Sequence, residues 1–462
     1  NSDTLSPVTA SNKILTQSDA SIASGIIDTL DSGFSDLGAL DYEEFDKDIS
    51  HIAFYGQSLS MGWEADVALT TTNYSGTLML GDRVWTERGN TGLTAFNPLV
   101  ASTAPNCGES PAVATTNSFK RMFDRFHRRS GNVEFLTTNS GEGGKSIERL
   151  SKESTNGTNY YTTSFLNGVT NAKSVANTAS KTISCPAIVY MQGEHNYIDL
   201  SNAGLTPGST ATIDKDTYKG LLLTLKNNMQ SDVISNYGQT KKPLFFIYQV
   251  AGTYISNESM SINMAQVEFA NEQDDVILIN PTYGLPDYSG GHLSSNGYRW
   301  YGELIAKSLN KVFLKGEGEN IMRINSVNVS SNKVVINVHV PVSPLKFDVK
   351  TTPLQTSYGF KIRQNGVEQT ITDVKIVSGN TVVLTVGATL SGSVEVAYGG
   401  LNRNGSGNLR DSDRWISQYE YADETSLVKP TYTPVDENDV NYYGKKYPCW
   451  NWLQQFYYSV TI

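Results

Sequence analysis

The stretch HIAFYGQSLSMG, residues 51–62, passes directly from an apolar run into a turn bounded by two glycines. Its first five residues are typical of a buried β-strand, and similar apolar runs follow at 133–137, 187–191, 244–250 and 276–279. Apolar residues at helical spacing form stripes at 119–126, 218–229 and 298–309. Strands that alternate with helices predict an α/β fold, with a parallel sheet covered by helices on both faces.

The sequence changes character in its last third. Residues 326–342 and 381–396 alternate apolar and polar side chains, with Gly, Asn and Ser turns around them. Such alternation is typical of half-buried antiparallel strands. We therefore expect an α/β domain over residues 51–318, followed by a smaller antiparallel β-sandwich or jelly-roll-like domain over 319–462.

Residues 1–50 are acidic. They contain ten acidic residues and two lysines, so they carry −8 of the chain's net charge of −10. A polar segment rich in Ser and Asp buries little apolar surface. This composition predicts a linker or an oligomer-forming stalk.

Composition and charge exclude several classes of protein. Hydrophobic residues make up 39% of the chain, which is too apolar for global disorder. No apolar run approaches the ~18 residues of a membrane span. A basic cluster lies on the polar side of one helical stripe, which favours a solvated helix face over a nucleic-acid site; its members are Lys120, Arg121, Arg125, Arg128 and Arg129. The three cysteines lie far apart, without metal-ligand spacing, and their odd number argues against a disulfide scaffold.

Three predicted strands end in residues that carry chemistry. Ligands of parallel sheets bind beyond the carboxyl ends of the strands. Ser58, just after the first strand, is therefore either a nucleophile or a helix N-cap. The pair Gly143-Gly144 follows the second strand and can offer bare backbone N–H groups. Gln192 follows the third strand, and its side-chain amide can complete an oxyanion hole.

A nucleophilic serine needs a base. His195 lies in the loop after the third strand, where Glu194 is best explained as a buried strut. His292 follows the fifth strand and precedes the last helix of the α/β region. A loop histidine there can reach back over the sheet edge, and Asp287 is close enough in sequence to orient it. His292 is therefore favoured over His195.

The ordered set Gly56-Gln57-Ser58, Gly143-Gly144, Gln192-Gly193-Glu194 and Asp287 with His292 resembles the SGNH hydrolases, in their sialate O-acetylesterase and acetylxylan-esterase branch. This resemblance covers about residues 51–315. It implies a flavodoxin-like three-layer domain that removes acyl groups from a carbohydrate without a metal or an organic cofactor.

By the same resemblance, Ser58 is the nucleophile and His292 the general base. The backbone N–H groups of Ser58 and Gly144 and the side chain of Gln192 form the oxyanion hole, with Asn196 as the alternative amide. The family usually places an aspartate three residues before the histidine, where this chain has Ser289. The third triad member is therefore Asp287, a backbone carbonyl, or no residue.

The flanks resemble bacteriophage tail proteins. Residues 7–19 are similar to linkers that precede the receptor-binding domains of tail fibres, and residues 407–412 with Asn451-Trp452 are similar to tail proteins with deacetylase domains. These matches imply a homotrimeric tail spike or fibre on the virion, acting on O-acetylated bacterial surface polysaccharide. The N-terminal segment would then dock to another virion protein.

Two alternatives stay open at this point. The chain is a receptor-binding adhesin whose esterase fold has lost its chemistry, or it is a free, secreted acetylxylan-type esterase of a bacterium. The displaced aspartate keeps the first alternative open, and the oligomeric state distinguishes the second.

Overall fold

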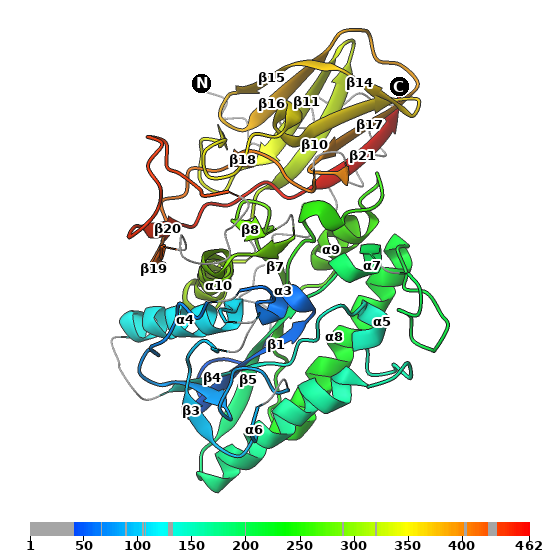
Figure 1. Ribbon diagram of the computed structural model, residues 1–462. Coiled ribbons are helices and arrows are strands. Elements are labelled where there is room, and N and C mark those ends of the chain that lie inside the picture. The colour runs from blue at the N-terminus through cyan, green and yellow to red at the C-terminus, as the bar shows by residue number, and fades with distance from the viewer. Residues whose placement is uncertain are drawn as a thin grey trace, which may run out of the picture.

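The computed structural model describes residues 41–65, 67–87, 90–103, 106, 108–127, 133–198, 200–288, 291–318, 321–401, 404–423 and 432–462. Its first part is built around a seven-stranded sheet with the order β3-β2-β4-β1-β5-β6-β7. Its second part consists mainly of antiparallel sheets (Figure 1). An α/β region followed by a β region is therefore confirmed.

All five predicted strands are present and parallel. They are β1 (Ile49–Gly56), β4 (Glu134–Asn139), β5 (Ile183–Met191), β6 (Leu244–Ile247) and β7 (Val276–Leu278). Their spatial order, β4-β1-β5-β6-β7, is 2-1-3-4-5 in chain order. In such a doubly wound sheet the winding reverses next to the first strand, and ligands bind at the carboxyl ends of the strands there. This places the end of β1 at the expected position of a site.

Two strands at one side of the sheet were not predicted from the sequence. β2 (Thr77–Leu80) pairs parallel with β4, and β3 (Phe96–Pro98) pairs antiparallel with β2. The sheet is therefore mixed, and the expectation of a parallel sheet holds only for its other six strands. Strands of three or four residues are too short to show a period, and Pro98 suits an edge position because it donates no hydrogen bond.

Helices cover both faces of the sheet. α4 (Pro111–His127) and α10 (Ser295–Leu309) lie on one face; α6 (Asn167–Thr178), α8 (Lys215–Tyr237) and α9 (Ser261–Glu272) lie on the other (Figure 1). Successive residues of β1 point to opposite faces. Ile52 and Phe54 enter one core, whereas Ala53 and Tyr55 enter the other. Burying an Ile or a Phe contributes about 1.5–3 kcal/mol, so both helical layers are held by apolar packing.

Shorter elements lie in the connections. They are α3 (Ser58–Met61), α5 (Ile147–Leu150), η3 (Tyr161–Leu166), α7 (Glu194–Ile198), η4 (Gly252–Tyr254), β8 (Asp287–Tyr288), β9 (His292–Leu293) and η5 (Asn310–Leu314). α3, α7 and β8 lie at the end of the sheet that faces the second region (Figure 1). No helix in the described ranges is long and apolar enough to cross a membrane.

The α/β region begins before the expected boundary at residue 51. Phe45 is buried, with its ring centroid 4.9 Å from that of Phe135 and 4.8 Å from that of Phe313. Tyr42 forms a parallel bridge with Lys242. The last ten residues of the expected linker thus pack against the α/β core, while residues 1–40 lie outside the described residues. In the sequence, the acidic residues around Phe45 give no indication that its side chain is buried in the core.

The second region is a sandwich of two four-stranded antiparallel sheets. One contains β10 (Arg323–Ser330), β11 (Lys333–His339), β16 (Thr381–Val386) and β15 (Ile371–Val377). The other contains β14 (Val367–Gln369), β13 (Phe360–Gln364), β17 (Ser393–Tyr398) and β21 (Phe456–Thr461). Alternate residues of both sheets, such as Ile336 and Val396, share one core. The predicted β-sandwich is therefore confirmed, and a small pair, β12 (Lys346–Phe347) and β18 (Leu409–Arg410), adjoins it.

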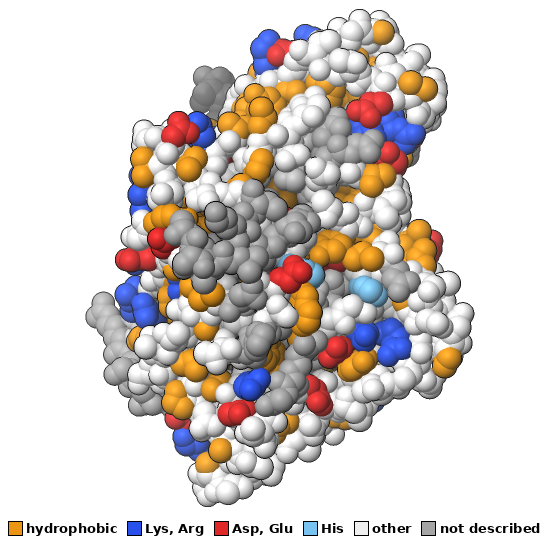
Figure 2. Space-filling view, viewed as in Figure 1, with side chains coloured by type: hydrophobic (Ala, Val, Ile, Leu, Met, Phe, Trp, Pro, Cys, Tyr) orange, Lys and Arg blue, Asp and Glu red, His pale blue; other side chains and the backbone are white. Residues whose placement is uncertain are grey.

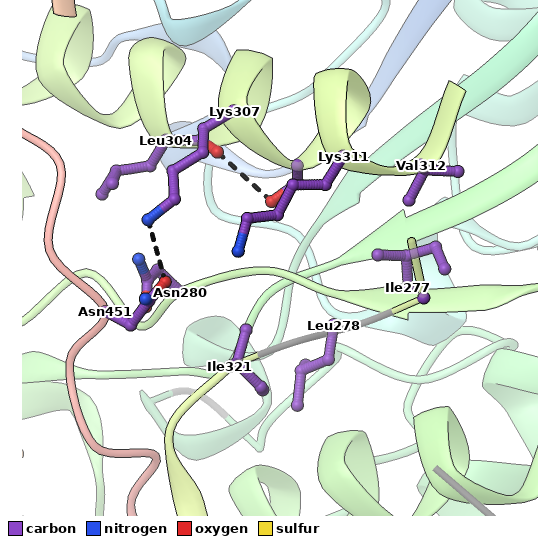
Figure 3. A pocket seen from close by; sticks show the side chains of 11 residues that line it. Ile277, Leu278, Asn280, Leu304, Lys307, Lys311, Val312, Ile321 and Asn451 are labelled. Carbon is purple, nitrogen blue, oxygen red and sulfur yellow. Dashed lines mark hydrogen bonds between the residues drawn. The ribbon is translucent and has the colours of Figure 1, made fainter. Parts of the chain in front are cut away.

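The chain then returns to the α/β region and covers α10. This return contains β19 (Ile416–Glu420) and β20 (Lys446–Pro448). Tyr447 stacks on Trp300 with ring centroids 5.2 Å apart. Lys307 Nζ donates to Cys449 O at 2.7 Å. It also donates to Asn451 Oδ1 at 3.0 Å (Figure 3). The sequence shows one apolar stripe on α10, whereas the structure buries its polar side as well. The segment expected to belong only to the C-terminal domain therefore ties the two regions together.

Candidate active site

Three strand ends converge where the sequence analysis expected them. Glu142 N donates to Gly56 O at 2.9 Å, so the loop after β4 lies against the end of β1. Gln57 N donates to Met191 O at 2.9 Å, which joins the end of β5 to the same point. Gly56 has φ +147°, and a Cβ there would lie 2.0 Å from Met191 O. Only glycine permits this approach.

Ser58 stands at the centre of these loops. It is the first residue of α3, so it is not the N-cap; that position belongs to Gln57. Ser58 is 8% exposed, and its Oγ lies 2.8 Å from Nε2 of His292. His292 comes from β9, which pairs with β8 in a short hairpin ahead of α10. The structure thus brings together the expected nucleophile and the favoured base, and not His195.

The carboxylate that orients His292 is not the expected one. His292 Nδ1 lies 2.9 Å from Oε2 of Glu64, which follows α3 in the chain. Asp287 lies on β8, where it pairs with Leu293, and lines a different pocket. In this structure Glu64 is the carboxylate hydrogen-bonded to His292, so the assignment of Asp287 as the third triad member stays a prediction that this contact does not favour. Glu64 approaches from the nucleophile's own loop, which reasoning from the histidine's neighbours could not reveal.

The backbone of Glu64 is unusual. Its φ is +66°, a conformation that costs an L-residue roughly 1–2 kcal/mol. Its N–H donates to Asn106 O at 2.7 Å, and that bond helps to hold the turn. Strained residues of this kind cluster at functional sites, where the surrounding structure holds them in place. The observation supports a role for Glu64 in the site.

The hydrogen bonds determine the protonation of His292. A carboxylate at Nδ1 holds a proton on that nitrogen, which leaves Nε2 free to accept the hydroxyl proton of Ser58. Burial lowers the pKa of His292, and the charge and hydrogen bond of Glu64 raise it only in part. The imidazole is therefore neutral near neutral pH, as a general base must be.

This pKa shift predicts the acidic limit of activity. A base must be unprotonated, so kcat/KM should fall only when the pH drops through a value below 6.5, the ordinary pKa of histidine. The measurement is kcat/KM for p-nitrophenyl acetate from acidic to neutral pH. A fall in kcat/KM with its midpoint above pH 6.5 would contradict the assignment of His292 as the base.

The amides expected in the oxyanion hole are already engaged. Gln192 Nε2 donates to Lys145 O at 3.3 Å and to Asn196 Oδ1 at 2.7 Å. Asn196 Nδ2 donates to Glu148 Oε2 at 3.2 Å and to Thr212 O at 3.0 Å. Each amide has only two N–H donors, so neither has one to spare. In this structure these side chains brace the loops around Ser58, and their assignment to the oxyanion hole stays a prediction that these contacts do not favour.

Backbone groups remain as oxyanion donors. The N–H of Ser58 lies at the start of α3, where it has no intrahelical acceptor. Gly144 is exposed, and no described residue accepts a hydrogen bond from its N–H. A Cβ at Gly144 would meet only His195 Cε1, at 3.9 Å, so the space beside it is open. These two groups are the ones the sequence analysis named.

Two further side chains shape the site. Gln57 Oε1 accepts from Gly193 N at 3.3 Å and from His195 N at 3.1 Å, which ties the loop after β5 to the nucleophile's loop. Glu194 is buried and accepts from the hydroxyl of Tyr248, and burial raises its pKa to about 7. Burial and this hydrogen bond agree with the structural role expected for Glu194.

In the view of Figure 2, histidine side chains reach the surface below the sandwich, and one of them lies beside an acidic side chain.

Sequence comparison finds no matching family model and no similar curated protein. Among solved structures, a carbohydrate acetylesterase from Xanthomonas citri is similar at 14% identity and a TM-score of 0.50, covering 88% of this chain and 80% of that one. NanS matches at 13% identity and a TM-score of 0.35, over 51% of this chain and 78% of its own. A family two carbohydrate esterase from Clostridium thermocellum matches at 13% identity and a TM-score of 0.29, over 59% and 66%. At these identities, the first likeness shows a shared fold.

Proposed function

We propose that this chain is a serine esterase of the SGNH type that removes acetyl groups from a carbohydrate. The observation that carries the proposal is the chain of hydrogen bonds from Ser58 through His292 to Glu64. It stands at the carboxyl edge of a doubly wound sheet, where such folds bind ligands. The fold likeness to a carbohydrate acetylesterase supports the substrate class.

The reaction proceeds in two steps. His292 Nε2 takes the proton of Ser58 Oγ, which attacks the acetyl carbonyl, and the N–H groups of Ser58 and Gly144 stabilise the negative oxygen. His292 then gives the proton to the departing sugar hydroxyl, leaving an acetyl-serine. Water, deprotonated by His292, attacks this ester and releases acetate, and the proton returns to Ser58. Glu64 keeps the imidazole in one tautomer throughout.

The finer proposal concerns the biological setting. We propose O-acetylated bacterial surface polysaccharide as the substrate and a homotrimeric phage tail spike or fibre as the assembly, with the N-terminal segment docked to another virion protein. Support comes from the flanking sequence resemblance. Its first block, residues 7–19, lies outside the described residues. In its second block, Asp411 Oδ1 accepts from Asn451 N at 2.9 Å, so these residues also help to fix the C-terminal segment.

The adhesin alternative rested on the displaced aspartate. Glu64 supplies the carboxylate that is absent three residues before His292, and this favours the enzyme. The alternative of a free esterase differs in assembly: a spike is expected to be a trimer in solution, which sedimentation of the whole chain measures.

Acetate release tests the function directly. Wild-type chain should release acetate from O-acetylated bacterial polysaccharide and from p-nitrophenyl acetate, and Ser58→Ala from neither. Cleavage of p-nitrophenyl acetate alone would keep the esterase but reject the glycans tried. Cleavage of neither substrate by folded wild-type chain would favour the adhesin.

A further inference from the structure

A pocket of about 290 Å³ lies where the sandwich meets the α/β region. The α/β region contributes Asp287, Gly291 and Leu293 of the β8–β9 hairpin, together with the loop at Gly252 and Thr253. Gly291 and Thr253 are the chain neighbours of His292 and of Tyr254, whose ring centroid lies 6.1 Å from that of His292. The pocket and the catalytic histidine therefore share the same hairpin.

The sandwich and the returning chain supply the opposite wall. Its polar members are Thr352, Gln355, Asn404, Ser406 and Tyr432. Hydroxyls and amides thus line the pocket together with a single carboxylate, that of Asp287. This mixture donates and accepts hydrogen bonds without a strong net charge. It suits a neutral polyol better than an anion or an apolar group.

One polar group in the wall has an unmet hydrogen bond. The hydroxyl of Tyr432 is buried, and it makes no hydrogen bond of good geometry with a described residue, although Thr352 and Asp287 lie nearby. A buried hydroxyl without a partner costs about 1–3 kcal/mol. The hydroxyl has almost no accessible surface in this structure, so a ligand hydroxyl would supply the partner once the Tyr432 side chain turns toward the pocket.

The walls of the pocket are held in place by close contacts. Gly252 N donates to Gly405 O at 3.3 Å, and a Cβ at Gly405 would lie 2.1 Å from Gly252 O. Nearby, Gln455 N donates to Gln249 Oε1 at 2.8 Å, and Gln249 Nε2 donates to Gln455 O at 2.8 Å. These buried contacts join the two regions directly beside the pocket. They hold part of the wall in place, which lowers the cost of binding a ligand.

We propose that this pocket binds one neutral sugar unit of the glycan, adjacent to the unit whose acetyl ester reaches Ser58. The inference rests on the proposed function and adds a subsite to it. Ligand pockets usually measure about 300–1,000 Å³, so this volume suits a single ring rather than a longer chain. Asp287 then acts in substrate selection, through hydrogen bonds to sugar hydroxyls.

The test uses two substrates of one enzyme. p-Nitrophenyl acetate needs only the centre at Ser58, whereas randomly monoacetylated maltohexaose, cellohexaose or chitohexaose can also fill the pocket. Asp287→Ala and Tyr432→Phe should each raise KM for the preferred oligosaccharide roughly tenfold. Neither should change kcat/KM for p-nitrophenyl acetate. Tyr457→Phe makes the same chemical change on β21, outside the pocket, and should change neither substrate.

The results with the two substrates can overturn the subsite in three ways. Unchanged oligosaccharide KM in both pocket variants, with thermal unfolding like that of wild type, would overturn the subsite. A parallel loss on both substrates would also overturn it, because the residues would then only position the hairpin of His292. If wild type cleaves p-nitrophenyl acetate but none of the oligosaccharides, the esterase stands, these glycans are rejected as substrates, and the neutral-sugar subsite is overturned.

Discussion

Alanine at Ser58 or at His292 is expected to lower kcat for p-nitrophenyl acetate by about 10⁶-fold, the scale seen when a member of such a hydrogen-bonded pair is lost. Ser58 Oγ is the atom that forms the acyl-enzyme, and His292 Nε2, 2.8 Å away, moves its proton. Without either group, only the oxyanion donors remain. The double variant should be no slower than the single ones, because the two residues act as one unit.

His195→Ala is the matched control for the histidine. His195 contributes its backbone N–H to Gln57, and this bond survives the substitution. Turnover should therefore stay within a few-fold of wild type. A collapse of activity in His195→Ala, with His292→Ala still active, would reverse the assignment of the base.

Glu64→Gln is expected to lower kcat by about 10³- to 10⁴-fold, with little change in KM. An amide in place of the carboxylate no longer holds the proton on Nδ1. The imidazole then adopts the tautomer with its proton on Nε2, which faces Ser58 and cannot accept. The size of Gln is close to that of Glu, so a loss of activity reports on the proton and not on the packing.

Asp287→Asn makes the same chemical change at the position that the sequence favoured. It should leave kcat for p-nitrophenyl acetate near that of wild type, since Glu64 and not Asp287 bonds His292. Equal losses in Glu64→Gln and Asp287→Asn would mean that both carboxylates support the base. A loss in Asp287→Asn alone would restore the assignment made from sequence.

The strain at Glu64 offers a second readout. Glycine has no penalty at φ +66°, so Glu64→Gly should unfold at a temperature no lower than wild type while losing activity. Thermal unfolding followed by circular dichroism measures this. A marked drop in unfolding temperature would show that Glu64 contributes to stability, which would weaken the functional interpretation of its strained backbone.

Much of the architecture was readable from residue patterns. The five central strands are continuous apolar runs because both faces of the sheet are covered, and α4, α8 and α10 show stripes at helical spacing. The sandwich strands alternate because one face of each is buried. Each of these signals arises from neighbours in the chain. β2 and β3 were missed because three or four residues carry too short a pattern.

Local sequence patterns also located some residues of the candidate site and not others. Ser58, Gly144 and His292 follow strands, and the edge of a parallel sheet gathers strand ends whatever the details of the loops. Gln192 and Asn196 lie in the expected region but bond loop residues in this structure, because an amide's partners depend on loops that approach from elsewhere in the chain. A cue to Glu64 did exist: it is an acid only six residues after the serine.

By itself, the sequence determined the five central strands with α4, α8 and α10, the change to a β region, and a serine and a histidine at one edge of a sheet, since burial and periodicity are local properties of the chain. Only the tertiary structure decided that Glu64 orients His292, that the last segment covers α10, and that Asp287 faces an interdomain pocket. Each of these depends on the distance between atoms from separate segments. Such distances follow from how loops and regions pack, which no pattern of neighbouring residues records.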